Sequence, residues 1–292
     1  MKSGSFHLAA FAALTALLLT GCVTPYQFDD GAEFGDYSID ASEHELRFSR
    51  GNASVTIKAG STEAQINNWT ALHLPWEVRR ENGKYQIEPR LLERIVEPLL
   101  FGMAEKARTV VVDAGHGGDD PGAVGAAYKE KDLNLAVARL LKAELEKRGL
   151  SVVMTKETDI FIPLLQRVNI ADSAKAQLFI SIHHNAATNR RARGYSVYAP
   201  RDCSKHPGPS LVLAADIQYE LQKLPQVVDR GVNFADFVVL RANMPAVLVE
   251  LGFISNPTEE LMIGAPSRQK IEAAAIAEGV MRYLRRTGEK RK

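Results

Sequence analysis

From residue 109 onward, short apolar runs alternate with amphipathic stretches, and this alternation constrains the fold more than any other feature of the chain. Residues 109–113 (TVVVD) predict a buried strand. Residues 132–148 then show helical spacing, with Asp132 as the expected cap and Gly149 as the expected end. Because such alternation is typical of α/β proteins, the sequence predicts a mostly parallel sheet flanked by helices.

The same alternation continues to the C-terminal region. Further strands are expected at residues 151–155, 177–182, 194–199, 237–240 and 246–250. Further helices are expected at residues 163–175, 209–224 and 268–286. We therefore place one α/β domain at residues 108–287.

A smaller unit precedes this domain. From residue 45, apolar and polar residues alternate over short runs separated by turn signals such as Arg50-Gly51-Asn52, which predicts hairpin-like strands. Residues 89–100 then carry apolar side chains at helical spacing. We expect a small α+β module at residues 43–103. The polar, acidic stretch before it shows no sustained periodicity, so residues 22–42 are expected to be a tether.

The first 21 residues have the features of an export signal. Residues 8–19 are apolar except for one threonine, and this run is too short to span a bilayer, which takes about 20 residues. Leu19-Thr20-Gly21-Cys22 follows and resembles the lipobox of bacterial lipoproteins, in which the signal is cut before an acylated cysteine. We expect residues 1–21 to be removed and Cys22 to carry a lipid anchor. The alternative is an ordinary secretory signal, and both interpretations place the mature chain outside the cytoplasm.

Composition excludes several classes of protein. With 36 Lys+Arg and 35 Asp+Glu the formal net charge is +1, so no strong overall field favours nucleic acid, and no nucleic-acid partner is expected. Hydrophobic residues make up 46% of the chain, which excludes disorder as the dominant state. Only Cys22 and Cys203 are present, too few for a disulfide scaffold or a cysteine-rich metal cluster. Cys203 is expected to be a small structural residue.

Ionisable residues stand at the C-terminal ends of three predicted strands. His116 follows the first strand, His183 and His184 follow the third, and Glu250 ends the last. Glu130 precedes the first helix and is close enough along the chain to His116 to reach the same place. Open α/β sheets bind ligands at the rim formed by the carboxyl ends of their strands, so we expect these residues to meet there.

Two imidazoles and one carboxylate are typical ligands of catalytic zinc, with water in the fourth position. Zinc lowers the pKa of its water from 15.7 to about 7, and a second carboxylate can pass the proton to a leaving nitrogen. Without a metal, the same residues would have to act as a carboxylate pair on a glycoside or as a hydrolase triad. Adjacent strand residues point to opposite sides, so at most one of His183 and His184 is expected at the metal.

Five blocks of the sequence resemble a known family. VVVDAGHGGDDPGAVG, EKDLNLAVA, LFISIHHNA, DRGVNFADFVVLR and MPAVLVELGFISNPTEE stand in the order found in zinc-dependent N-acetylmuramoyl-L-alanine amidases of bacterial cell-wall turnover. The resemblance covers roughly residues 108–286. It implies hydrolysis of the amide bond between N-acetylmuramic acid and L-alanine in peptidoglycan, for cell-wall turnover, remodelling or daughter-cell separation.

The resemblance also implies roles for individual residues. The Zn²⁺ ligands would be His116, Glu130 and His183, and the catalytic glutamate would be Glu250. His184 occupies a position where the family usually has alanine, and its role stays open. Some family members carry a helix between the last two blocks that covers the zinc. The interval from His183 to Glu250 leaves no evident room for one, so an open site is expected.

The small module weakly resembles the copper amine oxidase-like N-terminal domain of bacterial envelope proteins. The matching positions are Gly60-Ser61, Ala64, Ile66-Asn67 and Pro89-Arg90-Leu91. No copper chemistry is expected, because the segment offers only His44 and His73. The resemblance implies that the module positions the enzyme or binds an envelope partner.

Together these resemblances imply an enzyme on the periplasmic side of the cell envelope, with peptidoglycan as its substrate. A lipid on Cys22 would anchor it, in the outer membrane if the cell is Gram-negative, because Val23 and not aspartate follows the cysteine. Two alternatives stay open: a zinc peptidase that cuts within the stem peptide, and a non-catalytic lipoprotein that binds peptidoglycan.

Overall fold

The computed structural model describes residues 26–28, 32–34 and 36–286. The expected signal segment and Cys22 lie outside these residues. Within the part of the chain that the structure describes, no helix combines the length and the apolar character needed to cross a membrane.

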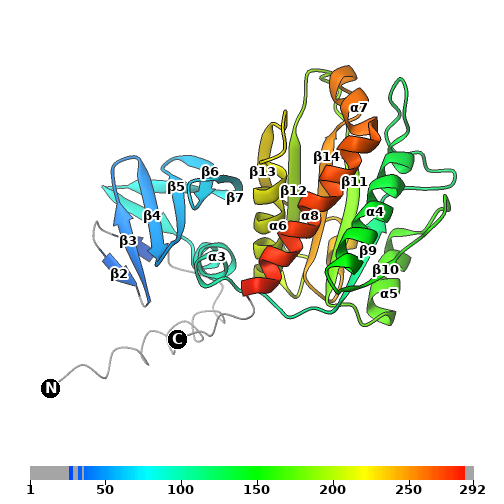
Figure 1. The fold of residues 1–292 in the computed structure, drawn as a ribbon. Coiled ribbons are helices and arrows are strands. Elements are labelled where there is room, and N and C mark those ends of the chain that lie inside the picture. Colours follow the sequence, from blue (N-terminus) through cyan, green and yellow to red (C-terminus); the bar gives the residue numbers. More distant parts are fainter. Residues whose placement is uncertain (1–25, 29–31, 35, 287–292) are drawn as a thin grey trace.

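The C-terminal part is built on a mixed sheet of six strands in the order β10-β9-β11-β14-β12-β13 (Figure 1). The strands are β9 (Thr109–Ala114), β10 (Ser151–Met154), β11 (Leu178–Asn185), β12 (Tyr195–Pro200), β13 (Asp229–Ala235) and β14 (Ala246–Phe253). Neighbouring strands run parallel except β12 and β14, which are antiparallel.

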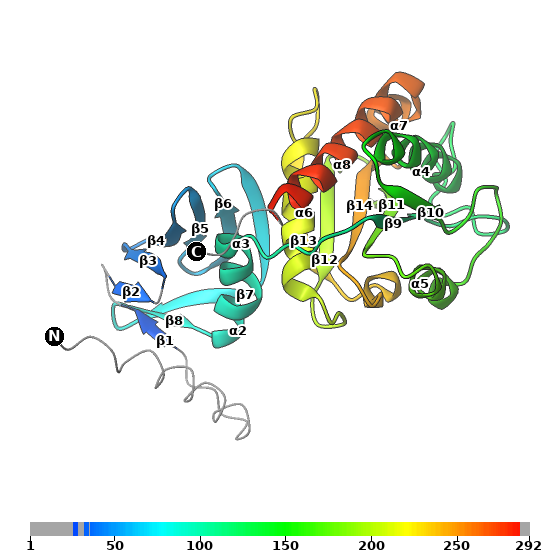
Figure 2. The ribbon, with the colours of Figure 1, turned by 60° about the horizontal axis from the view of Figure 1, so that its bottom comes forward.

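Helices cover both faces of this sheet (Figure 2). The helices are α4 (Glu130–Lys147), α5 (Leu164–Ser173), α6 (Pro207–Leu221), the 3₁₀ helix η2 (Val238–Arg241), α7 (Pro257–Gly264) and α8 (Pro266–Arg286). The face under α4, α6 and α8 is lined by residues such as Val112, Ile180 and Val249. Alternate residues, including Val111 and Phe179, face α5 and η2. The predicted α/β class, with a mostly parallel sheet flanked by helices, is therefore confirmed.

The N-terminal part is a set of antiparallel strands with one helix that contains a π-helical turn. The strands are β1 (Tyr26–Phe28), β2 (Ala32–Phe34), β3 (Tyr37–Ala41), β4 (Glu45–Arg50), β5 (Ala53–Lys58), β6 (Ser61–Ile66), β7 (Thr70–Glu81) and β8 (Lys84–Ile87). The helix consists of α2 (Pro89–Leu91), a π-helical turn (Leu92–Val96) and α3 (Glu97–Phe101). Alternate strand residues, such as Leu46, Phe48 and Ile57, are fully buried in the core.

The tether expected at residues 22–42 is wrong where the structure describes this segment. Residues 26–28 pair with β8, and residues 32–34 pair with β3. Tyr37 and Ile39 are buried in the core of the module. These strands are only three to five residues long, so their own sequence shows little periodicity, and cross-strand partners stabilise them. The division of the chain into domains stays a prediction.

Three further expectations differ from the structure. The segment expected as a strand at residues 237–240 forms η2, while β13 and α7 were not expected. β13 has few apolar residues, and its strand is defined by pairing with β12 on one side and β7 on the other. Helix α4 begins at Glu130 and not at Asp132, which therefore lies within the first turn. These features depend on partners distant in sequence, which local patterns do not reveal.

The two parts of the chain share one continuous sheet. Strand β13 pairs in parallel with β7, with Val232 opposite Leu72 (Figure 1). The His206 Nδ1 and Glu105 Oε1 atoms lie 2.8 Å apart and link the connecting segment to the start of α6. A fragment that began at residue 108 would expose the edge of β13, so experiments on this protein are best done with the full chain.

Gly231 makes this junction possible, and we expect Gly231→Ala to weaken it. Gly231 has a φ of +69°, and an added Cβ would lie 2.5 Å from the Ala71 carbonyl oxygen. Gly83 is a matched control, because its φ is +81° and an added Cβ would have no atom within 4 Å. We expect Gly83→Ala to lower the free energy of unfolding by about 1 kcal/mol, the cost of a left-handed backbone alone. Gly231→Ala should cost about 2 kcal/mol more, because the backbone contact must also open. Urea unfolding followed by circular dichroism measures both, and equal losses would contradict the tight contact.

Candidate metal centre and active site

His116 lies in a sharp turn directly after β9. Its φ is +61°, a left-handed conformation that a non-glycine residue adopts only when its surroundings hold it there. The His116 carbonyl oxygen accepts hydrogen bonds from Arg167 Nη2 at 2.9 Å and from the Lys156 ammonium. The preceding Gly115 has no room for a Cβ, which would collide with the ring of His183. The turn is therefore shaped to bring two imidazoles together.

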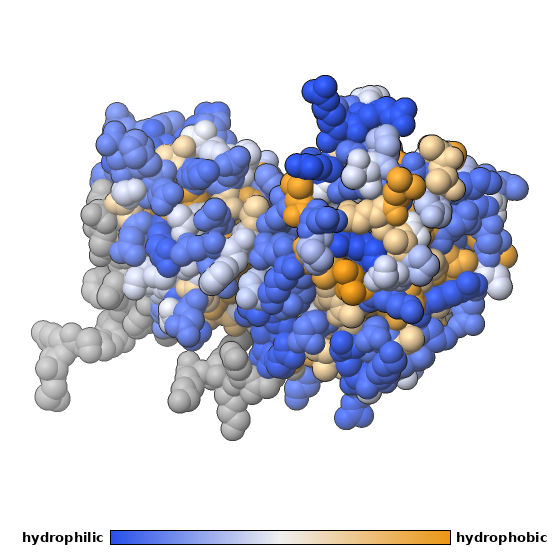
Figure 3. All heavy atoms as spheres, turned by 45° about the horizontal axis from the view of Figure 1, so that its top comes forward, coloured by the Kyte–Doolittle hydropathy of each residue, from blue (hydrophilic) through white to orange (hydrophobic). Residues whose placement is uncertain are grey.

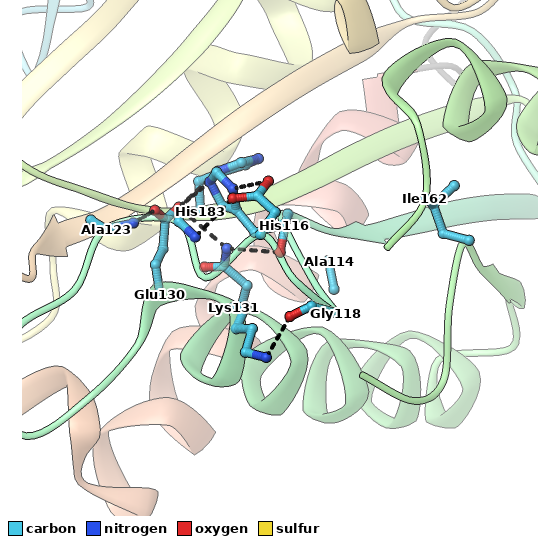
Figure 4. Close-up of polar contacts among 12 residues, drawn as sticks. Ala114, His116, Gly118, Ala123, Glu130, Lys131, Ile162 and His183 are labelled. Atoms are coloured by element: carbon cyan, nitrogen blue, oxygen red, sulfur yellow. Dashed lines mark hydrogen bonds and ion pairs between the residues drawn. The ribbon is translucent and has the colours of Figure 1, made fainter. Parts of the chain in front are cut away.

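Glu130 is the first residue of α4, and its side chain is almost fully buried. Glu130 Oε1 lies 2.9 Å from His183 Nδ1 and 3.2 Å from His116 Nε2 (Figure 4). Its second oxygen accepts a hydrogen bond from Ala123 N at 2.8 Å. The charged neighbours of Glu130 in the sequence are typical of an exposed helix start. In the structure, its side chain lies between two histidines.

His183 completes the group. Nitrogen and oxygen atoms of His116, Glu130 and His183 all lie within 4.8 Å of one another. The two imidazole rings meet edge to face, with centroids 5.0 Å apart. The structure thus brings together all three side chains that the sequence analysis assigned to a metal.

The chemistry of this donor set fits zinc. Two imidazole nitrogens and one carboxylate oxygen are the ligands that open catalytic zinc sites use. Burial would raise the pKa of Glu130, but hydrogen bonds from His116 and His183 outweigh it and hold that pKa well below its ordinary value. Glu130 is therefore a carboxylate, the form that binds a metal.

Glu250 lies on β14 directly opposite His183 of the neighbouring strand β11. The two side chains therefore project from the same face of the sheet. Glu250 Oε2 is buried and has no hydrogen-bond partner within the described ranges. Burial, and to a lesser degree the charge of Glu130, raise the pKa of Glu250 well above its ordinary value. A carboxyl group left without a partner beside a possible metal site is typical of a residue used in proton transfer.

His184 points to the opposite face, toward α4. Its side chain is fully buried, and its Nδ1 lies 2.8 Å from Asn134 Oδ1. Asn134 Nδ2 also donates to Gly115 O at 3.2 Å and to Glu130 Oε1 at 3.3 Å. Burial lowers the pKa of His184 to about 3, so the ring is neutral. His184 therefore packs behind the site and supports Glu130 through Asn134, a residue that sequence analysis did not single out.

A buried ion pair supports the His116 turn from the other side. Arg167 of α5 donates to Asp113 Oδ1 at 2.8 Å and to Ala114 O at 2.6 Å, in addition to His116 O. Asp113 also accepts hydrogen bonds from Thr155 Oγ1 and Ser181 Oγ, both at 2.7 Å. No local sequence pattern predicted this network. The one signal was an aspartate at the end of an otherwise apolar strand.

The fold and the site together define an α/β protein with a candidate catalytic metal centre at the carboxyl edge of its sheet. The family model for N-acetylmuramoyl-L-alanine amidases matches residues 110–282. The chain belongs to this family, as the sequence blocks predicted. The predicted enzyme class is therefore confirmed.

Named relatives agree. The chain is 30% identical to the N-acetylmuramoyl-L-alanine amidase AmiC of Neisseria meningitidis over 290 residues, which cover 85% of this chain and 64% of AmiC. It is 36% identical to AmiA of Escherichia coli over 224 residues, which cover 61% of this chain and 76% of AmiA. Among solved structures, the catalytic domain of CwlV from Paenibacillus polymyxa matches with a TM-score of 0.57 and 36% identity, covering 61% of this chain and 98% of CwlV.

Proposed function

We propose that this protein hydrolyses the amide bond between N-acetylmuramic acid and L-alanine in peptidoglycan, using Zn²⁺ held by His116, Glu130 and His183. The observation that carries the proposal is the convergence of these three donors beside Glu250, in a chain of the amidase family. When bound, Zn²⁺ supplies a Lewis acid that polarises a carbonyl group and makes water acidic enough to react near neutral pH.

Glu250 is the residue that moves protons in this mechanism. Its carboxylate takes a proton from the water that adds to the lactyl carbonyl carbon. As the C–N bond breaks, the same group gives that proton to the alanine nitrogen, so the products are a lactyl carboxylate and a free amine. Its second oxygen makes no other hydrogen bond in the part of the chain that the structure describes, and so is available for this role.

Product analysis tests the proposed reaction. We expect the purified full chain to release peptides with new N-terminal L-alanine from isolated cell walls, as detected by mass spectrometry. A chelator should abolish release, and added Zn²⁺ should restore it, because two imidazoles and a carboxylate alone supply no Lewis acid. New termini within the stem peptide would show a peptidase. Binding to walls without any cleavage would show a non-catalytic protein.

We further propose that the protein acts in the cell envelope, anchored by a lipid on Cys22. The apolar segment and the lipobox-like sequence Leu19-Thr20-Gly21-Cys22 support this. The module at residues 43–103, with its resemblance to copper amine oxidase-like N-terminal domains, would then position residues 108–287 relative to the wall or bind an envelope partner.

The helix between His183 and Glu250 supports the proposal that the active site is open. This helix, α6, packs on α8, on the face of the sheet opposite the Glu250 side chain.

A further inference from the structure

We propose that Arg190, Arg191, Arg193 and Arg230 form a basic rim that binds carboxylate groups of the peptidoglycan stem peptide beside the candidate active site. The proposal rests on the proposed function, because it names what the same site recognises on the peptide side of the amide bond. It is carried by the position of these arginines, by the absence of close ion pairs to them among the described residues and by the chemistry of the substrate.

Three of the arginines lie on the loop between β11 and β12, which follows the strand that carries His183. Asn256 Nδ2 donates to Ala192 O of this loop at 3.2 Å, and Gly194 N donates to Glu259 Oε1 at 2.7 Å. Both partners lie just beyond the end of β14, the strand that carries Glu250. Figure 1 shows the loop projecting from the top edge of the sheet near α7. The loop is therefore fixed at the same edge as the candidate site.

Arg230 joins this loop from β13. Its Nη1 donates to Arg193 O at 3.4 Å, and its guanidinium carbon lies 5.1 Å from the centre of the Phe253 ring. Burial raises the pKa of Tyr198, the charge of Glu250 raises it further, and the charge of Arg230 lowers it. Strand β13 neighbours β12, and Ser196 of β12 lies opposite Glu250, so Arg230 stands two strands away from the candidate active site.

The rim arginines form no close ion pairs within the described part of the chain. All four arginines are exposed. Glu259 is within range of the charge of Arg193, but its carboxylate already accepts hydrogen bonds from Gly194 N and Phe253 N. Glu260 likewise accepts from Ala127 N and Tyr128 N. In a chain with a net charge of +1, this leaves a local excess of positive charge.

The substrate carries its negative charge on the peptide side of the scissile amide bond, which is the side that the basic rim would contact. In a muramyl peptide the lactyl carboxyl group is consumed in the scissile amide, so the remaining carboxylates lie on the peptide side. Guanidinium groups bind carboxylates through paired hydrogen bonds, which gives orientation as well as attraction. Figure 3, in which the top edge is turned forward, shows strongly hydrophilic residues at the upper edge of the larger lobe beside exposed apolar ones. This arrangement suits a peptide with both charged and apolar parts.

A wall-binding experiment tests the basic rim. The full chain carries Glu250→Gln, which prevents digestion, and binding to purified peptidoglycan is measured by co-sedimentation. Adding Arg190→Gln, Arg191→Gln and Arg230→Gln should raise the apparent Kd by about tenfold, as expected for three partly screened charge pairs. A control with the same change in charge replaces three exposed lysines at the opposite edge of the sheet: Lys106→Gln, Lys175→Gln and Lys205→Gln. The control should bind within about twofold of the parent.

Converting the carboxylates of the peptidoglycan to carboxamides tests whether these are the groups that the basic rim binds. On amidated peptidoglycan the parent should bind as weakly as the rim variant. Unchanged binding by the rim variant, or a loss that persists on amidated walls, would overturn the proposal. A loss of binding that is seen only with phosphatidylglycerol vesicles would instead assign the rim to a membrane surface.

A double variant at Arg190 and Arg191, whose side chains make no hydrogen bond within the described segments, repeats the test if the triple variant unfolds. The rim variant could bind walls more weakly while the protein with an intact Glu250 cleaves no bond in them. That outcome would reject the proposed function but keep the basic rim.

Discussion

Glu250→Gln should lower kcat on peptidoglycan by about 10³-fold, within the range expected for loss of a general acid–base group. Glutamine has the shape of glutamate but cannot accept and return a proton. The fold should tolerate the change, because burial already raises the pKa of Glu250 and disfavours its charge. Glu250 is also not among the three grouped metal donors, so metal content should stay near that of the parent.

Kinetics with elemental analysis of the same samples checks this prediction. Glu130→Gln is the informative comparison, because it alters a carboxylate that lies between two imidazoles. We expect Glu130→Gln to lose both zinc and activity, whereas Glu250→Gln loses activity alone. A Glu250→Gln protein that keeps more than about a tenth of the parent kcat would remove this residue from the mechanism.

Arg167→Met should lower the free energy of unfolding by about 3–5 kcal/mol, the usual cost of removing one partner from a buried ion pair. The side chains of Arg167 and Asp113 are only 2% and 1% exposed. The substitution would leave the buried Asp113 without its ion-pair partner and would remove the Arg167 hydrogen bonds to the carbonyl oxygens of Ala114 and His116, of which the second would keep only Lys156. We therefore expect the His116 turn to loosen, and zinc affinity to fall with stability.

An exposed ion pair is the control for this effect. Arg285 and Glu278 lie 2.8 Å apart, with side chains 61% and 42% exposed. Arg285→Met should cost less than about 1 kcal/mol, because water screens such pairs. Urea unfolding of the full chain measures both variants, and zinc titration measures the effect on the site. If Arg167→Met proved as stable as Arg285→Met, the buried pair would not hold the turn.

Much of the candidate site could be predicted from the sequence, because strands and helices have local periodicities. Apolar runs that end in His116, His183 and Glu250 showed that these residues would stand at one edge of a sheet. Glu130 was different. Its neighbours Lys129 and Lys131 are typical of a solvated helix start, and its role was inferred from the resemblance to a family.

Other features depend on contacts that no local pattern encodes. The tether prediction failed because Tyr37 and Ile39 are buried against strands that follow later in the chain. Strand β13 was missed because its few apolar residues carry little periodicity, and the strand is defined by pairing with β12 and β7. The position of the loop after β11 likewise depends on hydrogen bonds to residues beyond β14, which lie more than 60 positions further along the chain.

The sequence by itself determined the α/β class, the order of most elements and which ionisable residues follow buried strands, because residue spacing and turn chemistry act over a few positions. Tertiary structure alone decided that Glu130 lies between two histidines, that Arg167 and Asp113 hold the His116 turn, and that Arg230 meets the arginine-rich loop near the end of β14. These arrangements join residues far apart in the chain, and they form only when packing offsets the entropy lost in bringing distant segments together.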